Sequence, residues 1–339
     1  MKLDVKAWVD SPREVPAAAK AAEEMGFDTF WASETSHDPF VLASLAGAET
    51  ERLSVGTAIA LAFPRSPMLT ANSAWDLQSL TNGRFTLGLG PQVRAHIVRR
   101  FSTEWSPAAS RMRDYIGAVR AIWACWQDGG RLSYESNSYN LSLMTPWFSP
   151  GPIEHPSIPI YLAAVNKDML RVAGEIADGV HVHPMHTTRY IREFVLPHIQ
   201  EGASRAGREA SQVELTSMAF VITGRNAEEM ADSRRKVRQQ IAFYASTPTY
   251  RPAVLEPDGW GEVGQQLSKL AREQRWQEME ALVPEEMERA IAVQGAWDEI
   301  GPLLTEKYNG LFNRITLYVD FKPGVQDDFW RTLERSFNA

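Results

Sequence analysis

The chain of 339 residues contains a single cysteine, Cys125, so no disulfide can form within it. A metal site built from a cluster of thiolates is excluded for the same reason. The residues around Cys125, AVRAIWACW, have a helical pattern, in which a free cysteine is typically buried. The sequence therefore predicts a thiol that serves packing.

The chain also lacks an excess of positive charge and any long apolar run. Its 35 lysines and arginines are outnumbered by 42 aspartates and glutamates, and the net charge of −7 gives no basic footprint for nucleic acid. No segment approaches the roughly 20 apolar residues that span a bilayer, and the opening residues MKLDVKAWVD contain no apolar signal core. We therefore expect a cytoplasmic protein that binds a small molecule and neither a membrane nor a nucleic acid.

Apolar strands alternate with amphipathic helices along the chain. Leu53–Gly90 holds one complete unit, in which Ser66 and Pro67 begin the helix between two strands. Such strand, helix, strand crossovers are right-handed and parallel in almost every known case. We expect strands at residues 5–9, 29–32, 53–61, 84–89, 158–164, 179–183, 213–223 and 313–321, and further helices at residues 16–25, 39–48, 108–127, 167–177 and 189–206.

This alternation predicts an α/β fold, a closed (β/α)8 TIM barrel that forms a single domain over residues 1–339. A doubly wound open sheet is the alternative, because the order of strands is not visible in one sequence. Two segments exceed what a barrel needs. Leu132–Pro156 follows the fourth helix and is expected to be irregular, whereas residues 225–301 follow the seventh strand and are charged and helical at both ends. The second insertion contains interleaved aromatics and is either an active-site lid or an outer helical hairpin.

The active site of a barrel lies at the carboxyl ends of its strands. The densest polar group at any predicted strand end is Ser33-Glu34-Thr35-Ser36-His37-Asp38. Glu34 and His37 are candidates for acid–base catalysis. Alternatively, Asp38 before Pro39 is an ordinary helix cap, and His37 forms only local hydrogen bonds.

The other predicted strand ends are less polar. Residues 58–63 are apolar and suit a flat aromatic ligand, and Gly90 before Gln92 brings the backbone close to a ligand, although a lone glycine pair is a weak signal. Asn166 opens a helix whose free N–H groups suit an anion, or is a plain cap.

Three histidines, His181, His183 and His186, follow the sixth strand in the sequence HVHPMH. No cysteine or carboxylate lies at a spacing that would complete a zinc site, so a metal is not expected. We expect these histidines to donate hydrogen bonds to a ligand.

Several short motifs follow one another in a characteristic order. They are Trp31-Ala32-Ser33-Glu34, Gly56-Thr57-Ala58-Ile59, Pro67 with Ala71, Asn82-Gly83-Arg84-Phe85, Leu87-Gly88-Leu89-Gly90, PIYLAA at residues 159–164 and AGEIADG at residues 173–179. With these motifs the chain resembles the bacterial luciferase-like superfamily over nearly its whole length. The motifs are most similar to those of the branch that uses the deazaflavin coenzyme F420.

This resemblance implies a barrel, usually a homodimer, that holds the tricyclic ring of the reduced coenzyme face-on in its mouth. It also implies a non-prolyl cis peptide, here at Ala58-Ile59, behind the ring. With the polar group after the second strand, the expected catalytic residues are Glu34 and His37. The expected coenzyme-binding residues are Ser33, Glu34, Ala58, Ile59, Gly90, Gln92, Ala163, Ala164, Val165, Asn166 and His183.

The chain departs at two positions from the sugar-phosphate dehydrogenases of the superfamily. Thr35 stands where they carry a catalytic histidine and Val93 where they carry a glutamate, so their substrate and mechanism do not transfer. His37 is a candidate for the missing base.

The expected function is hydride transfer between coenzyme F420 and an unidentified organic substrate, with the protein positioning and shielding the ring. The first alternative is a monooxygenase of the same superfamily that uses reduced FMN and oxygen. The second is a barrel that binds a flavin-like ligand without chemistry, because no residue is an unmistakable acid or base.

Overall fold

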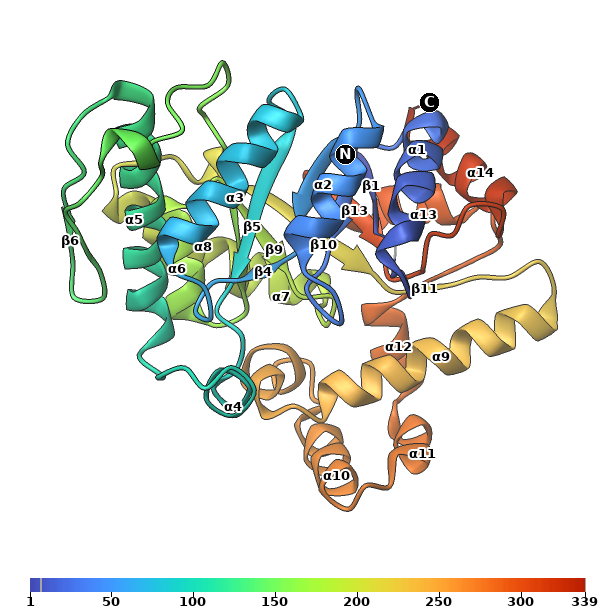
Figure 1. The fold of residues 1–339 in the computed structure, drawn as a ribbon. Coiled ribbons are helices and arrows are strands. Elements are labelled where there is room, and N and C mark those ends of the chain that lie inside the picture. The colour runs from blue at the N-terminus through green and yellow to red at the C-terminus, as the bar shows by residue number, and fades with distance from the viewer. Residues whose placement is uncertain (7, 339) are drawn as a thin grey trace.

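The computed structural model describes residues 1–6 and 8–338, which form a closed barrel of parallel strands (Figure 1). The strands are β1 (Lys2–Lys6), β2 (Thr29–Ala32), β3 (Ser54–Thr57), β4 (Ala60–Leu61), β5 (Phe85–Gly90), β8 (Ile160–Ala164), β9 (Gly179–Val182), β10 (Glu214–Ala219) and β13 (Arg314–Leu317). They follow the order β3-β2-β1-β13-β10-β9-β8-β5-β4, and β3 also pairs with β5. Because both β3 and β4 pair with β5, they share one barrel position and the ring closes. The predicted TIM barrel is confirmed, and the open sheet is excluded.

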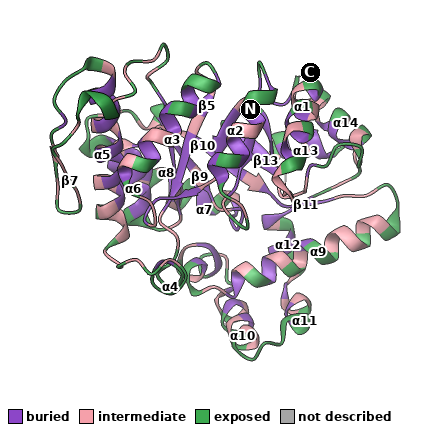
Figure 2. Ribbon diagram, viewed as in Figure 1, coloured by how far each residue is buried: buried purple, intermediate pink, exposed green. Residues whose placement is uncertain are grey.

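Helices cover the outside of the barrel (Figure 1), and their buried faces turn toward the strands (Figure 2). They are α1 (Val15–Met25), α2 (Pro39–Glu49), α3 (Pro67–Leu80), α4 (Arg94–Arg99), α5 (Ala108–Asp128), α6 (Lys167–Ile176), α7 (Thr188–Tyr190) with the π-helical η3 (Ile191–Val195), α8 (Leu196–Arg205), α13 (Ile300–Tyr308) and α14 (Asp327–Asn338). Ser66 caps α3 as predicted, because its side chain accepts a hydrogen bond from the amide of Leu69 at 3.2 Å. The predicted burial of Cys125 is also confirmed, with 7% of its surface exposed.

Four strands differ clearly from their predicted bounds. The last strand, predicted at residues 313–321, ends at Leu317. The first strand is β1, Lys2–Lys6, and of the predicted range 5–9 residue 7 lies outside the described residues. The amide of Trp8 donates to the carboxylate of Asp320 at 2.9 Å. The predicted strand 53–61 is interrupted at the Ala58-Ile59 peptide. The predicted strand 213–223 is also two strands, because β11 (Val221–Ile222) leaves the barrel and pairs with β12 (Val293–Gln294).

The two extra segments have different structures. Between α5 and β8 lie an antiparallel hairpin of β6 (Tyr134–Glu135) with β7 (Asn140–Leu141) and a turn of 3-10 helix, η2 (Pro146–Phe148). The second segment contains α9 (Ala227–Ala245), η5 (Pro248–Tyr250), η6 (Arg251–Leu255), α10 (Gly261–Arg272), α11 (Trp276–Met279), η7 (Glu280–Leu282) and α12 (Glu285–Ile291). These helices lie on the side of the barrel where β5 leads into α4, which is the carboxyl end of the strands (Figure 1).

A charged layer crosses the interior of the barrel. The carboxylate of Asp4 accepts two hydrogen bonds from Arg314, at 2.9 and 3.0 Å, and one from the indole of Trp31 at 2.8 Å. Asp4 and Arg314 are both buried, so each charge has its partner inside the protein. In the described part of the chain, no helix is both long enough and apolar enough to cross a membrane.

Candidate active site

A cavity opens at the carboxyl ends of the barrel strands. It is lined by Lys6, Trp31, Ala58, Ile59, Ala163, Val165, His181, Val182, His183, Pro184, Thr216, Ser217, Met218 and Thr316. These residues come from strands all around the ring, so the cavity is the mouth of the barrel, where active sites of this fold lie. The residues with ionisable side chains on its wall are Lys6, His181 and His183.

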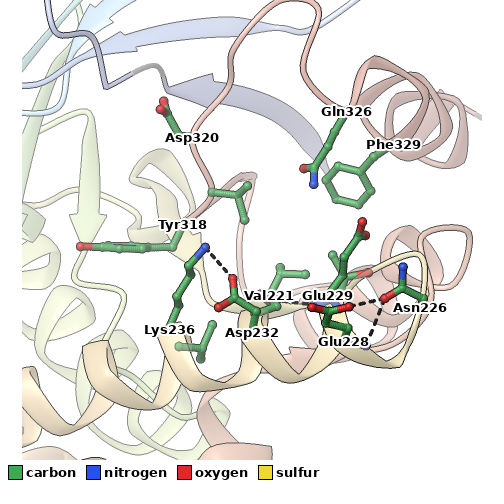
Figure 3. Close-up of a pocket in the computed structure, with 14 residues that line it drawn as sticks. Val221, Asn226, Glu228, Glu229, Asp232, Lys236, Tyr318, Asp320, Gln326 and Phe329 are labelled. Atoms are coloured by element: carbon green, nitrogen blue, oxygen red, sulfur yellow. Dashed lines mark hydrogen bonds and ion pairs between the residues drawn. The ribbon is translucent and has the colours of Figure 1, made fainter. Parts of the chain in front are cut away.

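A larger hollow lies outside the mouth, between α9 and the segment that joins β13 to α14 (Figure 3). Polar side chains of this hollow form hydrogen bonds and ion pairs within α9 and its cap. The side chain of Asn226 accepts from the amides of Glu228 and Glu229 at 3.1 and 3.0 Å, and Asp232 pairs with Lys236 at 2.7 Å. These are the contacts of a capped helix and an exposed ion pair, so we place the active site in the barrel mouth.

One wall of the cavity is the peptide between β3 and β4. The bond Ala58-Ile59 is cis, as the resemblance implied. The hydroxyl of Ser33 donates to the carbonyl of Ala58 at 2.6 Å, so Ser33 supports this wall from behind. Gly90 supports it too, because a Cβ at Gly90 would lie 2.6 Å from Cδ1 of Ile59. Ala58 and Ile59 thus present a small apolar surface held by two supporting residues.

Glu34 is engaged in contacts outside the cavity. Its carboxylate accepts from the amide of Leu61 at 2.7 Å and from the guanidinium of Arg65 at 2.6 Å. Arg65 also pairs with Asp38 at 2.8 Å, and Asp38 caps α2. Glu34 therefore anchors β4 after the cis peptide. His37 is half-buried on the connection to α2, and it is not part of the cavity wall either.

The remaining predicted residues divide into two groups. Ala163, Val165 and His183 line the cavity with Ala58 and Ile59, whereas Gln92, Ala164 and Asn166 do not. The side chain of Asn166 accepts from the amide of Met169 at 3.0 Å, which is the ordinary capping contact at the start of α6.

His181 and His183 point into the mouth because alternate residues of β9 share one face. Burial, with the positive charges of Arg314 and Lys6 nearby, lowers the pKa of His181 to about 3. Its Nε2 atom is buried and forms no hydrogen bond with the described residues. This atom lies against β5, because a Cβ at Gly88 would be 2.8 Å from it.

Burial also lowers the pKa of His183 to about 3, so this ring is neutral at neutral pH. Its Nδ1 accepts from the amide of Met185 at 3.1 Å, and the proton of the neutral ring is therefore on Nε2. His186 lies apart from the cavity, against Tyr308 and Phe312. Among residues 1–6 and 8–338, no group of three or more histidine, cysteine, aspartate or glutamate side chains is arranged to hold a metal ion.

The second insertion reaches the cavity through aromatic side chains. The ring of His183 packs against Tyr244, with ring centres 4.5 Å apart, and against Tyr250, at 4.7 Å. The hydroxyl groups of Tyr244 and Tyr318 are 2.9 Å apart, which ties α9 to the end of β13. Trp260 is buried but does not line the cavity.

Sequence reasoning missed Lys6, Trp31 and Met218 on the cavity wall. Lys6 is only 7% exposed, and burial lowers its pKa to about 7 against the opposing charge of Asp320. The signal was present in the sequence, because the charged residues Lys2, Asp4 and Lys6 alternate with apolar residues and so share one face of the strand. A charged residue inside a predicted barrel strand marks an inward-facing polar position.

The sequence is similar to that of known proteins over most of its length. The family model described as luciferase-like monooxygenase matches residues 2–314. An uncharacterized protein of Mycobacterium tuberculosis is 43% identical over 307 residues, which cover 90% of each chain. A 5,10-methylenetetrahydromethanopterin reductase of Methanopyrus kandleri is 26% identical over 307 residues, covering 86% of this chain and 84% of the reductase.

Solved structures show the same fold. The coenzyme F420-dependent tetrahydromethanopterin reductase from Methanopyrus kandleri superimposes with a TM-score of 0.79 at 20% identity, covering 99% of this chain and 97% of that one. The EDTA monooxygenase from Chelativorans sp. BNC1 superimposes with a TM-score of 0.75 at 12% identity, covering 100% and 93%. The chain therefore belongs to the luciferase-like monooxygenase family.

Proposed function

We propose that the protein is an oxidoreductase that transfers a hydride between the deazaflavin coenzyme F420 and a small organic substrate in the barrel mouth. The observation that carries the proposal is the apolar wall of Ala58 and Ile59. It faces a cavity in which the ionisable side chains, among the described residues, are two neutral histidines and one lysine. The similarity to a reductase whose solved structure is described as F420-dependent supports the choice of coenzyme.

The residues present fit such a coenzyme. The side chains of Ala58, Ile59 and Ala163 are apolar and can pack against a ring. The Nε2–H of His183 is a donor for a polar ring edge. The free N–H groups at the start of α6 suit a phosphate. When bound, the coenzyme supplies or accepts the hydride. The protein's own part is to orient the reactants and to exclude water.

Ser33, Gly90 and Glu34 act in this proposal as positioning residues. Ser33 and Gly90 hold the Ala58-Ile59 peptide, and Glu34 holds β4 through the amide of Leu61. His37, Gln92, Ala164 and Asn166 do not line the cavity and stay candidate ligands only. We also propose a homodimer, for which the exposed side chains of Trp147 and Phe148 after β7 are the interface candidates.

A second candidate is an FMN-dependent monooxygenase, which the description of the matched family favours. Oxygen dependence separates the two. The purified protein would be mixed with reduced F420 and a panel of carbonyl, imine and alkene acceptors in an anaerobic cell, and coenzyme oxidation would be followed by absorbance. We expect turnover without oxygen. Turnover that needs both reduced FMN and oxygen would select the monooxygenase.

The insertion is expected to shape the substrate side of the mouth as a lid. Replacing Tyr250 with alanine removes the ring that packs on His183, and we expect the KM of the substrate found in that panel to rise about tenfold, or about 1.4 kcal/mol. Coenzyme affinity should change less than KM. Phe243→Ala is the matched control, because this side chain of α9 is 49% exposed. Equal losses in KM and coenzyme affinity for Tyr250→Ala would show that the residue serves the coenzyme instead.

A further inference from the structure

Lys6 carries the one ammonium group on the cavity wall. It is the last residue of β1, and its Nζ lies 3.8 Å from the sulfur of Met218 and 4.5 Å from the ring centre of Trp8. Among the residues that the structure describes, no carboxylate oxygen lies within 4.0 Å of this nitrogen. The other buried cation of the barrel, Arg314, is paired with Asp4. The protein therefore supplies an ion-pair partner to Arg314 but not to Lys6.

An ammonium group buried without an anion is costly, so such a group binds an oxygen of a ligand or loses its proton. Ionisable groups of two neighbouring elements face Lys6. On β9, His181 and His183 are neutral at neutral pH, and after β13 only the charge of Asp320 opposes the effect of burial. Burial brings the pKa of Lys6 to about 7. Lys6 is thus the group on the described cavity wall whose charge changes near neutral pH.

We propose that Lys6 is the catalytic acid of the site and donates its proton to the carbonyl oxygen of an aldehyde or ketone substrate. The inference rests on the proposed hydride transfer. The substrate carbon gains a C–H bond from the hydride of the reduced deazaflavin, and the C=O π bond breaks. Its electron pair takes the proton from Nζ of Lys6. The carbonyl compound is reduced to an alcohol, the deazaflavin is oxidised, and the neutral amine regains a proton from water.

The first test needs no coenzyme. The pKa of Lys6 would be measured by NMR on protein labelled at lysine Cε, with Lys6→Met to assign the signal. Because the pKa in the folded protein lies below the unfolded value of 10.5, the unfolded state binds the proton more tightly, and stability rises with pH between about 7 and 10.5. Lys6→Met should therefore raise the thermal midpoint at pH 7, by about 2 °C or more. This gain should disappear as the pH approaches 10.5. A Lys6 signal that titrates above pH 9, or a less stable Lys6→Met variant at pH 7, would overturn the proposal.

The second test follows carbonyl reduction. We expect kcat of Lys6→Met to fall about 100-fold at pH 7, as is usual for the loss of a general acid, with coenzyme affinity within about twofold. In the wild type, kcat/KM should fall tenfold per pH unit above the measured pKa of Lys6. The control is Lys307→Met, which removes a half-buried ammonium outside the mouth that donates to the carbonyl of Ala292 at 2.8 Å. It should leave kcat and the pH profile unchanged.

A raised KM with unchanged kcat in Lys6→Met would show an anchor rather than an acid, and would overturn the proposal. If the wild type turns over only with reduced FMN and oxygen, the proposed function fails. The carbonyl proposal for Lys6 then fails with it. The NMR titration still shows whether the pKa of the Lys6 amine is lowered by burial. The two failures are therefore distinguishable.

Discussion

Replacing Gly88 with alanine is expected to lower the free energy of unfolding by about 3 kcal/mol or more, the upper part of the range for an overpacked core. A Cβ at Gly88 would lie 1.8 Å from the carbonyl oxygen of Thr57 and 2.8 Å from Nε2 of His181. β3 and β5 cannot move apart without breaking hydrogen bonds. The amide of Gly88 donates to the Thr57 hydroxyl at 2.9 Å, and this hydroxyl donates to the carbonyl of Gly88 at 2.7 Å. Urea unfolding, followed by tryptophan fluorescence, measures the change.

The same substitution is also expected to abolish coenzyme binding, because Thr57 immediately precedes the Ala58-Ile59 wall. Gly130→Ala is the matched control, since no heavy atom lies within 4 Å of a Cβ at Gly130. This control should change stability by less than about 1 kcal/mol. A Gly88→Ala variant as stable as the wild type would contradict the close approach of β3 and β5.

Replacing Asp4 with alanine is expected to cost about 3 to 5 kcal/mol of stability, the usual loss when one partner of a buried ion pair is removed. Arg314 would stay buried with its nearest remaining carboxylate, that of Glu214, at 3.7 Å, and the indole of Trp31 would lose its acceptor. Because Trp31 forms part of the cavity wall and contacts His181, coenzyme binding should weaken as well. The measurement is again urea unfolding.

Glu278→Ala is the control for this prediction. Glu278 pairs with Arg275 at 2.6 Å on the surface, where both side chains are about half exposed, and an exposed pair of this kind contributes about 0 to 1 kcal/mol. A second variant, Asp4→Leu with Arg314→Met, removes both charges and should recover part of the loss. If Asp4→Ala is no more destabilising than Glu278→Ala, the charged layer is not a stabilising unit of the barrel.

The order of elements was predictable because parallel strands buried on both faces leave continuous apolar runs. IYLAA at residues 160–164 is an example, and it forms β8. The bounds of β1 were harder to predict from the sequence. The predicted strand covered residues 5–9, but the extent of β1 depends on its pairing with β13. In that pairing Lys2 lies opposite Arg314, and the amide of Trp8 donates to the side chain of Asp320. Pairing across more than 300 residues is not encoded in local periodicity.

The site was predictable to the extent that strand ends mark the mouth of a barrel. That rule, with the family resemblance, found Ala58, Ile59, Ala163, Val165 and His183. The same rule predicted Glu34 as a site residue, because this acidic residue follows β2. The position of Arg65, whose guanidinium binds that carboxylate, depends on a fold contact between segments 31 residues apart.

Lys6 was missed because the first strand was predicted to run from residue 5 to residue 9. Lys6 then fell inside the predicted strand, whereas in the structure it is the last residue of β1. The lack of a carboxylate beside its ammonium group among the described residues, in contrast, becomes visible only in the folded barrel.

The most direct test of the central claim is an equilibrium titration of the coenzyme-free protein with F420 and, separately, with FMN. The account predicts that F420 binds at least about tenfold more tightly, a difference of about 1.4 kcal/mol. It also predicts that Ala163→Phe, which fills the mouth, abolishes this binding, while Ala48→Phe on the exposed side of α2 does not. Tight binding of FMN without binding of F420, or F420 affinity that survives Ala163→Phe, would contradict it.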